Sequence, residues 1–137
     1  MCGATRMLGR IVGDHGADTL TRSMAASALG EIACSPGGDG GLPPSVADML
    51  EDATRPAERA MVRQSAVRAL GRAKATGAID TLVALRDADE DPTVSVLAAQ
   101  ALTRITSEDF FDRAFLEDRV SGFIERATGY ELVEETP

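Results

Sequence analysis

Aromatic residues are scarce in this sequence. They make up only 4% of its 137 residues, with no tryptophan and a single tyrosine. The alternating runs of β-branched and aromatic residues that are typical of strands are also missing. Alanine, which has the highest intrinsic helix propensity, is abundant instead. This composition predicts an all-α protein of one domain, and the chain is long enough to bury a core without disulfides or metals.

Residues that ligate metals or act as nucleophiles are also few. His15 is the only histidine, and Cys2 and Cys34 are the only cysteines. A zinc site needs several ligands at defined spacings, and a catalytic triad needs a histidine beside its nucleophile. We therefore expect no enzyme activity, no metal and no cofactor, with His15 in a surface turn. Two cysteines favour reduced thiols in a cytoplasmic protein, although a Cys2–Cys34 disulfide stays open as an alternative.

Long apolar runs and an excess of positive charge are missing too. No segment approaches the roughly 18 uninterrupted apolar residues that a membrane helix requires. Residues 1–13 also lack the separate basic and apolar regions of a signal peptide. Lysine and arginine number 14 against 22 aspartates and glutamates, a net charge of −8. Because nucleic-acid binding depends on cations that displace counterions from phosphates, we expect neither nucleic acid nor a membrane as a partner.

An internal repeat is the main positive feature of the sequence. Three similar segments occupy Ala25–Ile32, Ala66–Ala73 and Ala98–Ile105. The Ala-Leu pairs of the second and third lie 32 residues apart, and those of the first and second lie 41 residues apart. The glycine- and proline-rich stretch 35–44 accounts for the difference, because it cannot be helical. A second segment type, Ala47–Leu50 and Ile79–Leu82, also recurs after 32 residues.

Each segment has the apolar spacing of an amphipathic helix. The third long segment carries its stripe at Val94, Ala98, Ala101, Leu102 and Ile105. Helix pairs are therefore expected at about 17–54, 56–88 and 92–127. A partial helix is expected at 4–13, one or two capping helices at 108–127, and an acidic tail at 131–137.

Several residues predict where these helices begin and end. Asp91 before Pro92 is a favourable helix start, since aspartate caps the N-terminus and proline suits the first turn. Pro56 predicts the first turn of the second long helix, and Gly77 predicts its end. Gly30 and Gly71 lie inside helices, where glycine is unfavourable, and predict close packing between helices.

The segment from Val62 to Val94 resembles a known family. It contains VRQSAVRALG, a Gly77 turn, AIDTLVALRD and then DPTV. This pattern resembles the HEAT-like repeat of phycobilin lyases and of many bacterial scaffold proteins. Two residues depart from it: Ser95 stands where the family usually has arginine, and Thr103 stands in the glycine position.

The resemblance implies a fold and a class of function. The fold would be a short right-handed α-solenoid (α-α superhelix) of about three helix pairs, whose second helices line a concave surface. Members of the family commonly hold proteins or peptides, and a few bind a bilin, a metal or DNA. The resemblance therefore implies a non-catalytic protein-interaction scaffold. The alternative is an auxiliary subunit or chaperone of a bilin lyase-like modifying enzyme.

Candidate binding residues lie on the two shorter segments. If their apolar stripes face inward, one polar set falls near the concave side: Asp48, Glu51, Asp52, Asp80 and Thr81. Such an acidic surface would complement a basic peptide or protein, although a merely solvated face is the alternative. Arg63 is expected to bond with a carboxylate of the neighbouring repeat, such as Asp87 or Asp91.

Overall fold

The computed structural model describes residues 3–34 and 42–128. These ranges contain seven α-helices, one 3-10 helix and no strand, which confirms the all-α prediction. The α-helices are α1 (Gly3–Gly13), α2 (Thr19–Cys34), α3 (Pro44–Asp52), α4 (Ala60–Arg72), α5 (Ile79–Ala88), α6 (Pro92–Thr106) and α7 (Arg113–Thr128). The 3-10 helix η1 (Thr76–Ala78) precedes α5.

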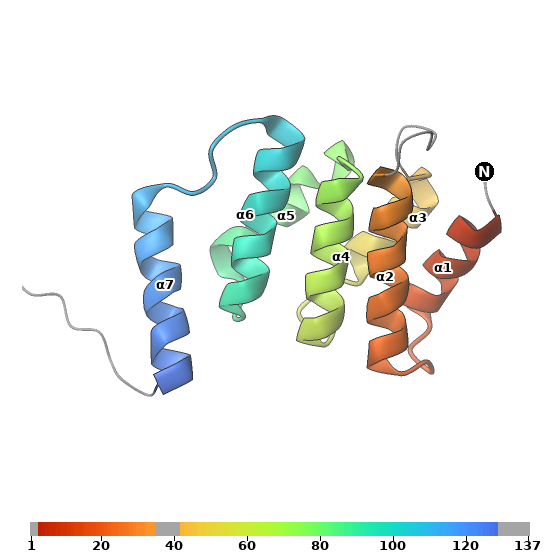
Figure 1. The fold of residues 1–137 in the computed structure, drawn as a ribbon, viewed down its shortest axis with the longest axis horizontal. Coiled ribbons are helices and arrows are strands. Elements are labelled where there is room, and N and C mark those ends of the chain that lie inside the picture. Colours follow the sequence, from red (N-terminus) through yellow and green to blue (C-terminus); the bar gives the residue numbers. More distant parts are fainter. Residues whose placement is uncertain (1–2, 35–41, 129–137) are drawn as a thin grey trace, which may run out of the picture.

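The helices form two layers (Figure 1). The long helices α2, α4 and α6 stand side by side in one layer, with α7 beyond α6, and α1, α3 and α5 lie behind them. Each short helix packs against the long helix that follows it, and α2 packs on α4 and α4 on α6. Helices α2 and α4 each contact more than one other helix, so the contacts do not divide the chain into separate helix pairs. The repeat boundaries at 17–54, 56–88 and 92–127 therefore stay a prediction.

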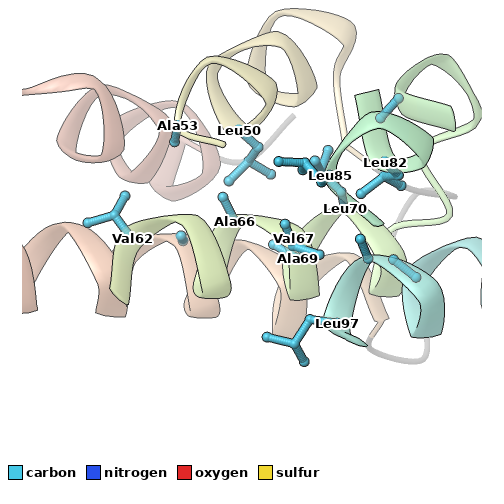
Figure 2. Packing of buried hydrophobic residues seen from close by; sticks show 14 of the residues in the cluster. Leu50, Ala53, Val62, Ala66, Val67, Ala69, Leu70, Leu82, Leu85 and Leu97 are labelled. Atoms are coloured by element: carbon cyan, nitrogen blue, oxygen red, sulfur yellow. The ribbon is translucent and has the colours of Figure 1, made fainter. Parts of the chain in front are cut away.

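The repeated leucines form the core between the two layers. Leu29, Leu70 and Leu102, from the three Ala-Leu pairs, are fully buried. Leu50 of α3 and Leu82 of α5 are fully buried against the same cluster (Figure 2). The side chains that recur in the sequence are therefore those that hold one layer against the other.

Glycines set the spacing within the long-helix layer. A Cβ on Gly30 would lie 2.9 Å from the Cα of Ala69, and one on Gly71 would lie 2.8 Å from the Cβ of Ala101. Such distances are too short for a side chain, so the predicted close packing is confirmed. Thr103 occupies the same position in the third copy, and its buried Oγ1 has no hydrogen-bond partner.

The predicted helix boundaries had mixed success. Asp91 is confirmed as the N-cap of α6, because its Oδ1 accepts a hydrogen bond from the Thr93 N–H at 2.9 Å. The prediction from Pro56 was wrong, since α4 begins only at Ala60.

The predicted end of the second long helix was also wrong. α4 ends at Arg72, and Lys74 takes the left-handed conformation there, with φ of 51°. Gly77 instead lies within η1. The left-handed position after a helix is usually occupied by glycine, but here it is occupied by Lys74. The sequence pattern did not indicate that the helix would end at this lysine.

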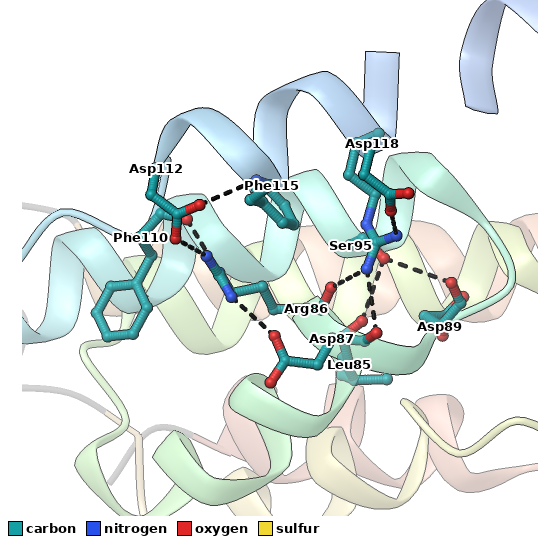
Figure 3. A network of polar contacts seen from close by, with 10 residues as sticks. Leu85, Arg86, Asp87, Asp89, Ser95, Phe110, Asp112, Phe115 and Asp118 are labelled. Carbon is teal, nitrogen blue, oxygen red and sulfur yellow. Dashed lines mark hydrogen bonds and ion pairs between the residues drawn. The ribbon is translucent and has the colours of Figure 1, made fainter. Parts of the chain in front are cut away.

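Helix α7 covers the C-terminal end of the helix array, where an arginine of α5 lies over an aromatic ring of α7. The Arg86 guanidinium lies 4.3 Å from the ring centroid of Phe115, and its Nε donates to the Phe110 carbonyl oxygen at 2.9 Å (Figure 3). Arg119 of α7 donates to the carbonyl oxygens of Arg86 and Asp87 at 2.8 and 3.1 Å. α7 therefore caps the C-terminal end of α5, where it supplies donors to two of the last carbonyls of the helix. The predicted tail at 131–137 lies outside the described residues.

Candidate functional site

A cleft of about 710 Å³ opens between the short helices α3 and α5. Its lining comes from these two helices and from the turns that follow them. The residues are Asp48, Glu51, Asp52, Thr54, Arg55, Pro56, Thr81, Ala84, Leu85, Ala88 and Asp89. The cleft thus combines an acidic rim with an apolar wall.

The structure brings four of the five candidate binding residues into this cleft. Asp48, Glu51 and Asp52 line it from α3, and Thr81 lines it from α5. Asp80 is exposed on α5, but it does not belong to the lining. Helical geometry explains the difference, because consecutive residues point about 100° apart around the axis.

Hydrogen bonds inside the cleft fix some carboxylates and leave others available. Thr81 Oγ1 donates to Glu51 Oε1 at 2.7 Å and so joins α5 to α3. Asp52 pairs with Arg55 at 3.0 Å, but both side chains are largely exposed, so the pair contributes little stability. Asp48 is exposed, and its side chain has no hydrogen bond or ion pair with another residue in the described part of the chain. Asp48 and Asp52 are therefore the carboxylates that an incoming cation can reach.

One carboxylate in the lining of the cleft is already paired with an arginine. Asp89, whose side chain is 3% exposed, accepts a bond from Arg63 Nη2 at 3.1 Å. The expectation that Arg63 would bond with Asp87 or Asp91 was therefore right about the type of partner and wrong about the residue. Asp89 lies in the turn directly after α5, within reach of α4, whereas Asp91 accepts a bond from Gln64 instead.

A second buried ion pair joins α2 to the turn before α4, and the sequence did not suggest it. Arg22 donates to both carboxylate oxygens of Glu58, at 2.8 and 2.5 Å, and to the Val12 carbonyl oxygen at 3.0 Å. The hydrogen bonds from Arg22 hold the pKa of the Glu58 carboxyl below its ordinary value near 4.5. Glu58 stands in the turn before α4, and Arg63 Nη1 donates to its backbone carbonyl at 2.6 Å. These bonds explain why the helix does not begin at Pro56.

The remaining candidate residues do not form a chemical site in the described part of the chain. His15 is confirmed in an exposed turn, with Nδ1 3.9 Å from Glu58 Oε2. The described residues contain no group of three or more histidines, cysteines or acids placed to hold a metal ion. None of the described helices has the length and apolar character needed to cross a membrane. Cys2 lies outside the described residues, so the thiol predictions stay predictions.

Comparison with known families agrees with this architecture. A family model described as HEAT repeats matches residues 47–122, from α3 to α7. The chain belongs to the HEAT-repeat family. The match confirms the α-solenoid, while the phycobilin lyase subtype is not part of what it shows. No curated protein matches the chain. HEAT repeats are commonly protein-interaction scaffolds, which points to protein partners in general for this HEAT-repeat chain.

Proposed function

We propose that this HEAT-repeat chain is a non-catalytic interaction scaffold whose cleft between α3 and α5 holds a basic segment of a partner protein. The observation that carries the proposal is the cleft itself, which places Asp48 and Asp52 beside the apolar side chains of Ala84 and Leu85. Lysine and arginine have long aliphatic stems and charged ends, so they can cover an apolar wall while meeting carboxylates at the rim.

The chemistry of the lining supports binding over catalysis. The residues that line the cleft include no histidine, cysteine, serine or lysine. The Thr81 hydroxyl already donates to Glu51, and the Thr54 hydroxyl donates to the Glu51 carbonyl oxygen at 2.6 Å. A volume of about 710 Å³ lies within the range of about 300 to 1,000 Å³ that is usual for ligand pockets and leaves room for a short peptide segment.

Binding of a short fluorescent peptide of alternating arginine and leucine, followed by anisotropy, tests the proposal. We expect Asp48→Asn combined with Asp52→Asn to weaken binding by roughly threefold to tenfold, because exposed ion pairs contribute up to about 1 kcal/mol each. The loss should shrink as salt is added, since salt screens exposed charges.

A matched control separates the cleft from general attraction to an acidic protein. Asp80→Asn combined with Glu108→Gln removes the same charge from exposed residues outside the cleft and should leave affinity nearly unchanged. Equal losses in the two double variants would contradict the proposal, as would failure of the unaltered protein to bind the peptide. A spectral shift on mixing with a bilin would favour the pigment-binding alternative.

A further inference from the structure

The long-helix layer has a hollow of its own, between α4 and α6. Its volume is about 320 Å³. It is lined by Arg68, Gly71, Arg72, Leu97, Gln100, Ala101 and Arg104. This groove lies on different helices from the acidic cleft, which is formed by α3 and α5.

The charge of this groove is opposite to that of the chain as a whole. Three arginines and one glutamine line it, and no carboxylate does, although the chain carries a net charge of −8. Arg68 and Arg104 are exposed, and they come from different helices. Positive charge is therefore concentrated where two helices meet.

Arg68 and Arg72 remain accessible to an incoming anion. Arg68 has no ion pair with any residue in the ranges that the structure describes. Arg72 pairs with Glu31 of α2, but the Glu31 side chain is 69% exposed. An exposed pair of this kind contributes at most about 1 kcal/mol, so another carboxylate can replace Glu31. In contrast, the buried arginines Arg22 and Arg63 are held by Glu58 and Asp89.

Close helix packing produces the shape of the groove. Gly71 and Ala101 meet at the contact between α4 and α6, so no large side chain fills the space between the flanking arginines. Leu97 adds an apolar side chain to the lining. The lining thus combines small and apolar residues with three guanidinium groups.

We propose that this groove binds an acidic segment of a second partner protein. Guanidinium groups recognise carboxylates through paired hydrogen bonds, and the accessible Arg68 and Arg72, with Arg104 in the same lining, suit a run of aspartates or glutamates. An apolar side chain of the same segment would lie against Leu97. A protein segment fits better than nucleic acid, because three cations on a strongly acidic chain neutralise few phosphates. The chain would then join a basic partner on one layer to an acidic partner on the other.

A short fluorescent peptide of alternating glutamate and leucine serves as the probe, with anisotropy as the readout at low salt. Arg68→Gln combined with Arg104→Gln should weaken binding about fivefold or more, because exposed ion pairs contribute up to about 1 kcal/mol each. The thermal unfolding midpoint of the variant is measured alongside, so that a loss of affinity is not confused with a loss of the fold. The Asp48→Asn and Asp52→Asn variant should bind this acidic probe at least as tightly as the parent, which keeps the test independent of the acidic cleft.

The control is Arg6→Gln combined with Arg113→Gln, two exposed arginines on α1 and α7. It changes the net charge by the same amount and should leave affinity unchanged. The proposal is overturned if both double variants lose affinity equally, or if the parent protein does not bind the acidic peptide. It is also overturned if a single-stranded oligonucleotide binds more tightly than the peptide. Self-association that the Arg68 and Arg104 changes abolish, measured by sedimentation, would make a second copy the occupant instead.

Discussion

Arg22 ties three parts of the chain together. Its guanidinium bonds with Glu58 in the turn before α4 and with the Val12 carbonyl oxygen at the end of α1, while Arg22 itself belongs to α2. The side chains of Arg22 and Glu58 are only 6% and 9% exposed. Removal of one partner from such a pair leaves a buried charge uncompensated, which is strongly destabilising.

Glu58→Gln should lower the free energy of unfolding at pH 7 by about 3 kcal/mol. The pKa of Glu58 is lowered in the folded protein, so its contribution is complete above the unfolded value near 4.5 and is lost as pH falls through the lower folded pKa. The difference between parent and variant should therefore shrink below pH 4.5. Urea denaturation across this range measures it.

An exposed ion pair provides the control for this measurement. Glu117 pairs with Arg113 one turn away on α7, and both side chains are well exposed. Glu117→Gln should change the free energy of unfolding by less than about 0.5 kcal/mol. A Glu58→Gln effect that stays constant with pH would show that the ionised carboxylate is not what stabilises the fold.

Among the helices, contacts through glycine determine how closely the long ones approach. Gly71→Ala should destabilise the protein by about 1 to 2 kcal/mol, because the new Cβ would lie 2.8 Å from the Cβ of Ala101. The overlap outweighs the gain of roughly 1 kcal/mol in helix propensity. Thermal or chemical unfolding gives the sign directly.

The same substitution elsewhere should have the opposite effect. Gly122 lies within α7, where a Cβ would meet only Pro92 Cγ at an ordinary 3.7 Å. Gly122→Ala should therefore stabilise the protein by up to about 1 kcal/mol. If Gly71→Ala were also stabilising, the close approach of α4 and α6 would not be required for the fold.

Sequence reasoning predicted the helices well because their signals are local. The leucines at positions 29, 70 and 102 repeat in sequence and are buried in the structure. Asp91 caps α6 through a bond to a residue only two positions away. The start of α4 was mispredicted at Pro56 because it depends on Arg22 and Arg63, which reach Glu58 from two different helices.

The candidate site was predictable only in outline. Asp48, Glu51 and Asp52 are spaced at i, i+3 and i+4 on one face of α3, opposite the buried Val46 and Leu50, so their common side could be inferred from spacing. Whether α5 presents Asp80 or Thr81 to the same cleft depends on its rotation against α4 and α6, which no local pattern specifies. The basic groove needs Arg104 of α6 beside Arg68 of α4, a register that the packing of Gly71 on Ala101 sets.

Across the whole molecule, stability should decline towards the C-terminal end. α2, α4 and α6 pack on one another along their lengths, whereas α7 contacts α6 less extensively and is held largely by Arg86, Arg119 and Phe115. Phe115→Ala should increase amide hydrogen exchange throughout α7 and leave α4 protected, because the cap can open without the rest. Equal acceleration in α4 and α7 would show a single cooperative unit instead.

Thr103 bears on how this array could be lengthened by design. In the first two long helices the corresponding residue is a glycine, Gly30 or Gly71, and the next long helix packs directly against it. In the third long helix, α6, this residue is Thr103, whose hydroxyl is buried. The next helix, α7, contacts α6 less extensively than the long helices contact one another. A further copy of the repeat inserted after residue 106 would need Thr103 replaced by glycine before it could dock at the native spacing. Thr103 is therefore the first residue to change in such an extension.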